Sequence, residues 1–252
     1  VKLGYKKILT FTYGRKGNFE LENSHNTAKI LGLPWIFIDY NPELIDGFIA
    51  TETFKEYFHF AGKASSMFYM QDYFAVKYLH DNQLIDRDAI FIPGHSGDFI
   101  AGSHLREHMA GITNTKKLVK LIYKSTFQYN KHLNHKKNLL FLMIKNFIKE
   151  KESSITAWQL FEYWDFMERQ AKFIVNSSSV FDFFGYEFRL PYWDKSLTSF
   201  FNSQSFENKI YKKLYNNTLE KMYFEPFKLN FKKELQASRF QVLIQHLKNR
   251  IK

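Results

Sequence analysis

KILTFTY (residues 7–13) and WIFIDY (residues 35–40) are two short runs rich in β-branched, aliphatic and aromatic residues, as buried strands are. Between them, GRKGN (residues 14–18) predicts a turn. Residues 20–31 have helical spacing, and Gly32 stands where helices commonly end. A strand, a helix and a second strand in this order predict a βαβ unit, with parallel strands and a right-handed crossover.

The same alternation continues to about residue 102. Residues 64–79 are expected to form a helix, and AIFIP (residues 89–93) a third strand, followed at once by GHSGD (residues 94–98). A polar turn after a parallel strand lies at the carboxyl edge of the sheet, where α/β folds bind ligands. Residues 115–151 and 155–175 have helical spacing. We therefore expect one domain over residues 1–252, with an α/β part (1–110) and a mainly helical part (111–252).

Composition excludes several classes of protein. The chain is 45% hydrophobic and 19% aromatic, which excludes a disordered tail. It has no cysteine, which excludes disulfides, thiolate zinc sites and cysteine nucleophiles and fits a cytoplasmic protein. No apolar run is long enough for a membrane span.

The net charge of +11 is unevenly distributed. Residues 111–149 contain nine lysines and no acidic residue, and residues 209–252 contain eleven basic residues against three acidic ones. Such basic segments suit an anionic partner, for example a phosphate, a nucleotide sugar, a nucleic acid or a lipid headgroup. A simply solvated helix face is the alternative.

Three motifs have residue types suited to binding phosphate. In GHSGDFIAG (residues 94–102), Gly94, Ser96 and Gly97 allow backbone amides to approach an anion, and Asp98 offers a carboxylate for Mg²⁺. A plain strand-to-helix turn is the alternative. RLPYWD (residues 189–194) places Arg189 beside aromatic residues and Asp194 where it can cap a following helix.

The third motif is KIYKKLY (residues 209–215), which we expect to form a helix with Lys209 and Lys212 within about one turn. Clustered lysines can stabilise a pyrophosphate leaving group, although a solvated face is the commoner explanation. His95, His104 and His108 suggest a metal site only weakly, because they match no established ligand pattern. The aromatic stripe Trp158, Phe161, Trp164, Phe166 and Phe173 is interpreted as core.

In their order along the chain, these elements resemble the synthetase domain of asparagine synthetases. AKILG (residues 28–32), the turn at residues 94–99, RLPYWD and the lysine pair Lys209 and Lys212 are similar to that family's motifs, with Phe99 in place of an acidic residue. The chain is most similar to shortened asparagine-synthase-like proteins of bacterial surface-polysaccharide clusters. The resemblance implies an α/β fold of the adenine nucleotide alpha-hydrolase type, truncated at its first strand, with a parallel sheet and flanking helices.

The resemblance also implies a reaction: ATP and Mg²⁺ adenylate a carboxylate, on a sugar or another small molecule, and ammonia displaces AMP to form an amide. Asp98 would bind the metal, and the backbone at Thr10, Thr12 and Tyr13 would flank the adenine. Lys209, Lys212 and Arg189 are the expected catalytic residues. Ammonia would come from solution or from a separate glutaminase.

Two departures from the family limit this expectation. The Ser-Gly-Gly-x-Asp-Ser loop that wraps pyrophosphate does not occur in these 252 residues, and VKLGY (residues 1–5) resembles the end of the helix that follows the loop. No N-terminal cysteine glutaminase is present either. We expect the chain alone to have little or no activity.

Two other functions remain open. The basic segments would also suit binding to tRNA, as in base-modifying relatives of the same superfamily. Such tRNA binding would depend steeply on salt concentration. The missing loop and Phe99 are also compatible with a catalytically inactive module that binds a partner.

Overall fold

The computed structural model describes residues 3–62, 68, 70–127, 131–151 and 155–231. It divides into two compact units, one formed by the described residues up to Asn41 together with those from Met222 onward, and the other by Pro42–Lys221. None of the helices in these ranges is long and apolar enough to cross a bilayer.

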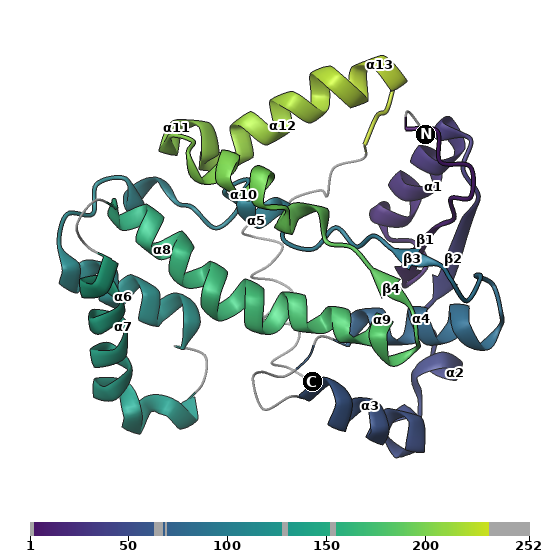
Figure 1. Ribbon diagram of the computed structural model, residues 1–252, viewed down its shortest axis with the longest axis horizontal. Coiled ribbons are helices and arrows are strands. Elements are labelled where there is room, and N and C mark those ends of the chain that lie inside the picture. The colour runs from purple at the N-terminus through teal and green to yellow at the C-terminus, as the bar shows by residue number, and fades with distance from the viewer. Residues whose placement is uncertain (1–2, 63–67, 69, 128–130, 152–154, 232–252) are drawn as a thin grey trace, which may run out of the picture. The chain divides into compact units, whose positions relative to one another are not determined.

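The first unit contains the predicted βαβ motif (Figure 1). β1 (Thr10–Gly14) pairs in parallel with β2 (Trp35–Asp39), with Thr10 opposite Trp35. α1 (Phe19–Leu31) connects them. Its N-cap residue Asn18 accepts a hydrogen bond from the amide of Glu20, and Gly32 ends the helix at φ 64°. The unit also includes α13 (Glu225–Phe227).

The second unit is mainly helical, as predicted for most of its length. Its helices and strands, besides 3₁₀ and π segments, are α2 (Pro42–Ile45), α3 (Glu52–Gly62), α4 (Gln71–Asp81), β3 (Ile90–Phe91), α5 (Gly97–Ile100), α6 (Thr115–Thr126), α7 (Lys137–Lys151), α8 (Ala157–Asp165), α9 (Ser179–Phe183), β4 (Glu187–Phe188), α10 (Lys195–Asn202), α11 (Phe206–Lys209) and α12 (Lys213–Leu219).

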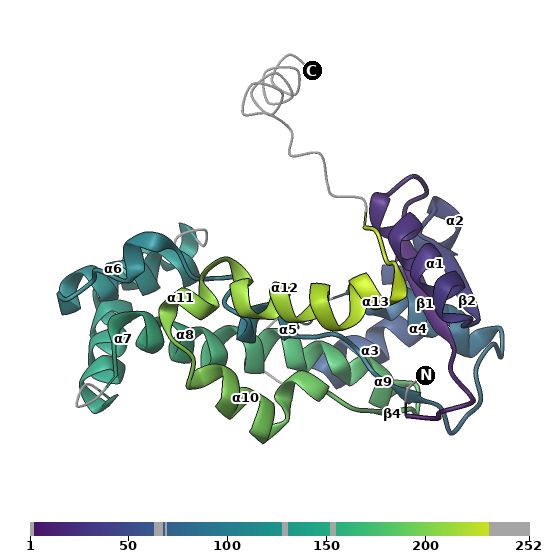
Figure 2. The ribbon, with the colours of Figure 1, turned by 90° about the horizontal axis from the view of Figure 1, so that it is seen from above.

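A continuous helical rod crosses the second unit (Figures 1 and 2). It starts as α8, continues as a π-helix (Phe166–Ile174) and a 3₁₀ turn (Val175–Ser178), and ends as α9. Both views place α6 and α7 at one end of the rod and α3 and α4 at the other. π-helical turns are rare and occur often at functional sites.

Each end of the rod has its own core. The aromatic stripe predicted as core supplies Trp158, Phe161 and Trp164, which are buried against α6 and α7. At the other end, Tyr57 of α3 stacks on Tyr73 of α4 with ring centroids 4.8 Å apart. The last two residues of the predicted stripe, Phe166 and Phe173, are only partly buried and so do not belong fully to the core.

Two expectations about elements were wrong, and a third is confirmed in part. The third strand forms as β3, but it pairs in parallel with β4 in a separate two-stranded sheet rather than with β1 or β2. The predicted lysine helix is interrupted, because Tyr211 and Lys212 have left-handed backbones (φ 59° and 57°) between α11 and α12. The helix expected at residues 64–79 is confirmed from Gln71 onward as α4, whereas residues 64–67 and 69 of that range lie outside the described residues.

The fold is therefore of the mixed α/β class, with many helices and small parallel sheets of two strands each in the described residues.

Candidate functional site

The turn after β3 is held in place by the side chain of Ser96. Ser96 has a left-handed backbone (φ 66°) and starts the short helix α5. Its buried hydroxyl donates to Gln170 Oε1 at 2.8 Å and accepts from Trp193 Nε1 at 3.2 Å. Gly94 closes the turn by accepting a hydrogen bond from the amide of Gly97 at 3.3 Å. The hydroxyl of Ser96, a residue of the turn whose backbone amides we expect to approach an anion, thus joins the turn to two other segments.

The motif RLPYWD packs directly on this turn. A Cβ atom at Gly97 would lie 2.7 Å from the Tyr192 ring, so only glycine allows the ring to approach so closely. Trp193 stacks on Phe166 of the π-helix with centroids 4.4 Å apart. Asp194 caps α10, as the sequence predicts, by accepting hydrogen bonds from two backbone amides.

Arg189 lies at the strand rather than in this cluster. Its amide donates to the carbonyl of Phe91 at 2.8 Å, which extends the β3–β4 pairing. Its exposed guanidinium pairs with Glu187 at 2.7 Å. The structure therefore does not bring the Arg189 side chain together with the two lysines.

Lys209 meets the other end of the turn at Gly102. Gly102 has a φ of 103°, and a Cβ atom there would overlap the carbonyl oxygen of Lys209 and lie 2.9 Å from its carbonyl carbon. Residues 94–102 therefore contact both RLPYWD and the start of the lysine motif. Two motifs that are far apart in the sequence thus converge on the third.

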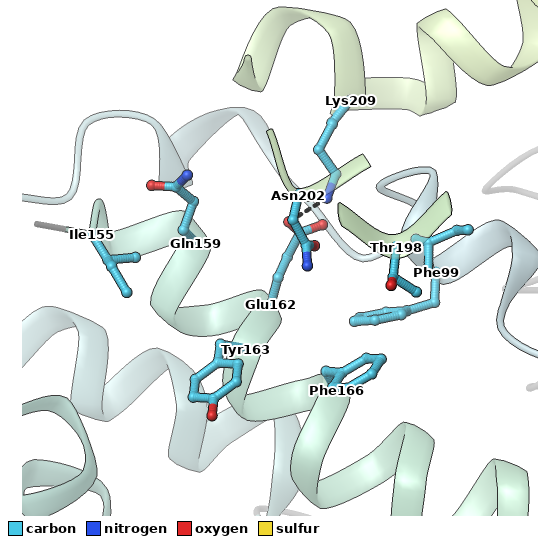
Figure 3. A pocket seen from close by; sticks show the side chains of 10 residues that line it. Phe99, Ile155, Gln159, Glu162, Tyr163, Phe166, Thr198, Asn202 and Lys209 are labelled. Carbon is cyan, nitrogen blue, oxygen red and sulfur yellow. Dashed lines mark hydrogen bonds and ion pairs between the residues drawn. The ribbon is translucent and has the colours of Figure 1, made fainter. Parts of the chain in front are cut away.

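A cavity of about 250 Å³ opens beside this point of convergence (Figure 3). Its walls combine aromatic rings and aliphatic groups with neutral amides, a hydroxyl and one ion pair. The lining residues are Phe99, Ile100, Ile155, Gln159, Glu162, Tyr163, Phe166, Thr198, Asn202 and Lys209. Cavities of this kind, mostly apolar with a few polar groups, commonly bind small molecules.

The ion pair in the cavity wall is deeply buried. Lys209 is 2% exposed and Glu162 is 7% exposed, and Lys209 Nζ donates to Glu162 Oε2 at 2.6 Å. Among the described residues, Glu162 Oε1 has no hydrogen-bond partner although it is buried. Burial raises the pKa of the Glu162 carboxyl, and the ammonium of Lys209 acts in the opposite direction.

Asp165, about one helical turn after Glu162 in α8, belongs to a second group of polar contacts. His104 Nδ1 is bonded to Asp165, and Arg169 Nη1 lies 3.1 Å from His104 Nε2. Arg169 can only donate, so Nε2 must accept, and Nδ1 carries the proton that is donated to Asp165.

Lys212 and Asp98 are both more exposed to solvent than Lys209 is. Lys212 is half-buried, and its ammonium makes no ion pair with any described residue. Asp98 is exposed and accepts a hydrogen bond from Ser103 Oγ at 3.0 Å. Burial, a hydrogen bond with Tyr192 and the nearby Asp98 raise the pKa of Tyr215. Tyr215 and Tyr192, whose hydroxyls are 3.1 Å apart, thus lie near this carboxylate.

The residues expected around adenine lie in the other compact unit. Thr10 Oγ1 donates to the carbonyl of Pro34 at 2.8 Å, and Thr12 Oγ1 donates to Ser24 Oγ at 2.7 Å. Tyr13 stacks on Tyr40 with centroids 5.1 Å apart. The hydroxyls of both threonines are therefore engaged within their own unit.

The histidines do not form a metal cluster within the described ranges, where no group of three or more His, Asp and Glu side chains is placed to bind one ion. His95 Nε2 lies 3.3 Å from Asp72 Oδ2, and its Nδ1 is 3.3 Å from Ser178 Oγ. This order of Ser, His and Asp is reminiscent of a nucleophilic triad, but Ser178 is fully buried. We assign the trio a structural role.

Sequence reasoning missed the polar residues of the rod. Glu162 and Asp165 stand three residues apart in a helix that is otherwise rich in aromatic residues, FEYWDF (residues 161–166). Two acids on one face of a buried helix require partners, and this was the signal that could have identified them. Gln159, Thr198 and Asn202 gave no comparable signal, because neutral polar residues are common on helix surfaces.

Comparisons with known proteins do not identify this arrangement. No protein-family model, no curated protein and no solved structure matches the chain.

Proposed function

We propose that this chain is part of an ATP-dependent ligase that activates a carboxylate and converts it to an amide. The observation that carries the proposal is the convergence of the turn at residues 94–102, RLPYWD and Lys209 beside one cavity. These are the same motifs on which the resemblance to asparagine synthetases rests. In the proposed reaction, ATP activates the carboxylate and ammonia, free or from a separate glutaminase, replaces AMP.

The cavity suits the body of a small polar substrate. Phe99, Tyr163 and Phe166 offer ring faces, and Gln159 and Asn202 offer amides that can both donate and accept. The charge of Glu162 is balanced by Lys209. Neutral polar groups beside aromatic walls fit a sugar ring or a similar hydroxylated molecule, which supports a sugar carboxylate as the substrate.

The two lysines differ in what they can do. Lys209 is committed to Glu162, so we propose that it positions the cavity wall and residues 94–102. Lys212 has an ammonium that is not ion-paired with any described residue, so we propose that it stabilises negative charge during the reaction. Lys212 is thereby the stronger candidate for a catalytic residue.

Among the described residues, the proposed nucleotide site has a single candidate metal ligand. Asp98 is the proposed Mg²⁺ ligand, yet it is a single carboxylate outside any cluster of three potential ligands in the described ranges. No Ser-Gly-Gly sequence is present to wrap the phosphates.

Exchange of labelled pyrophosphate into ATP, driven by a panel of uronic acids, tests the proposal on the full gene product. We expect exchange with at least one acid, and Lys212→Ala should lower its rate by about 10²-fold or more. Lys213→Ala, the exposed neighbour, is the matched control and should leave the rate nearly unchanged. Absence of exchange with every acid, or equal losses in the two variants, would contradict the proposal.

A further inference from the structure

The helices α6 and α7 form a strongly basic end of the second unit. Residues 111–149, which include α6 and most of α7, contain nine lysines and no acidic residue, and Glu150 follows in the last turn of α7. Lys116, Lys117, Lys120 and Lys124 of α6 are all exposed. Figures 1 and 2 show both helices at the end of the helical rod, away from α3 and α4.

α7 has an apolar stripe on the side that faces away from the core. Leu139, Leu142 and Met143 are 54%, 53% and 53% exposed. At about 100° per residue, they occupy one arc of the helix. Ile144 and Ile148 lie on the opposite side and are buried in the core between α6, α7 and α8. The exposed stripe is therefore a second apolar face, which core packing does not explain.

Two lysines lie along one edge of this stripe. By the same helical arithmetic, Lys145 and Lys149 lie within about 60° of Leu142 around the helix axis, and both are exposed. Scattered exposed apolar residues are normal, but three adjacent aliphatic side chains with flanking lysines are typical of a helix that lies in a membrane interface.

We propose that α7 attaches the protein reversibly to the surface of an anionic lipid bilayer. The stripe of Leu139, Leu142 and Met143 would insert among the acyl chains close to the headgroups. The lysines of α6 and α7 would remain among the lipid phosphates, to which a membrane-adjacent lysine is attracted. Nothing in this inference depends on the proposed ligase reaction.

Two other occupants of the surface fit less well. Nucleic acid would use the lysines, but single strands are bound mainly through stacking on aromatic rings, and the stripe is aliphatic. A second copy of the chain would bring two lysine-rich, strongly basic segments together, and their repulsion would oppose a symmetric dimer.

Cosedimentation of the full chain with vesicles tests the proposal. We expect binding to vesicles of phosphatidylcholine mixed with phosphatidylglycerol, and much weaker binding to phosphatidylcholine alone. Replacing Leu139, Leu142 and Met143 together by serine should lower the partition coefficient by about tenfold or more. Lys145→Gln should lower it by about fivefold, since one charge is lost near the surface.

A matched control replaces three other exposed aliphatic residues, Ile49, Leu84 and Ile92, by serine. This variant should bind mixed vesicles like the wild type, and circular dichroism should show that both triple variants are folded. Equal binding by the two triple variants, or no binding of the wild type, would overturn the proposal. So would binding of the wild type only to labelled tRNA, or a dimer in solution that dissociates when the α7 stripe is replaced.

Discussion

Lys209 loses most of its hydration in the fold, and the contacts of its ammonium must offset that loss. Its Nζ donates to Glu162 Oε2 and lies 5.9 Å from the centroid of the Trp158 ring. A buried ion pair often contributes little net stability compared with a well-packed apolar pair, but removal of one partner leaves an uncompensated charge. The pair is therefore a point at which single substitutions are costly.

Lys209→Ala should lower the free energy of unfolding by about 3–5 kcal/mol, because it leaves the Glu162 carboxylate buried without its partner. Lys212→Ala is the control and should change it by about 0.5 kcal/mol or less. Urea unfolding followed by circular dichroism measures both. If the double variant Lys209→Met with Glu162→Leu is no more stable than Lys209→Ala alone, the stranded charge is not the cause.

At the scale of elements, α1 and its two strands could be predicted from local sequence. The apolar runs, the N-cap at Asn18 and Gly32 all act within a few residues, so their physical causes are visible in the sequence. The pairing of β3 with β4 could not be predicted, because strands of two residues give almost no periodic signal and their partner is far along the chain. The break at Tyr211 and Lys212 likewise carries no glycine or proline to mark it.

The contact between Gly102 and Lys209 joins elements that are distant in sequence. Gly102→Ala should lower the free energy of unfolding by about 3 kcal/mol or more, since alanine is strained at a φ of 103° and its Cβ would overlap the Lys209 carbonyl. Gly111→Ala, where a Cβ would meet nothing within 4 Å, should cost about 0.5 kcal/mol or less. Chemical denaturation of the two variants gives the comparison, and equal costs would contradict the contact.

At the scale of the whole molecule, the sequence indicated which motifs carry the candidate site but not how they meet. The approach of Tyr192 to Gly97 and of Lys209 to Gly102 depends on tertiary packing that no local pattern encodes. Glu162, the charged centre of the cavity wall, was overlooked because its neighbours in the sequence are core aromatics. The burial of Lys209 and its ion pair with Glu162 likewise could not be predicted from the lysine motif alone.

The two compact units differ in how much core they contain, and this difference predicts their dynamics. Between residues 3 and 41, only Ala28 and Ile38 are buried, and β1 and β2 form a sheet of two strands. In contrast, α6, α7 and α8 share a large core that includes Ile122, Ile144 and Trp164. Segments with few buried contacts open with lower free energy than the core does.

Hydrogen–deuterium exchange measured by mass spectrometry should therefore separate the two units. We expect the amides of β1 and β2 to exchange at least about tenfold faster than those of α6 and α8 under native conditions. Peptides from α3 and α4, which belong to the second unit but lie away from α6, serve as the internal reference and should resemble α8, because Tyr57, Tyr73 and Leu79 are fully buried there. Equal protection of β1, β2 and α8 would mean that the short sheet gains its stability from contacts beyond its own few buried residues.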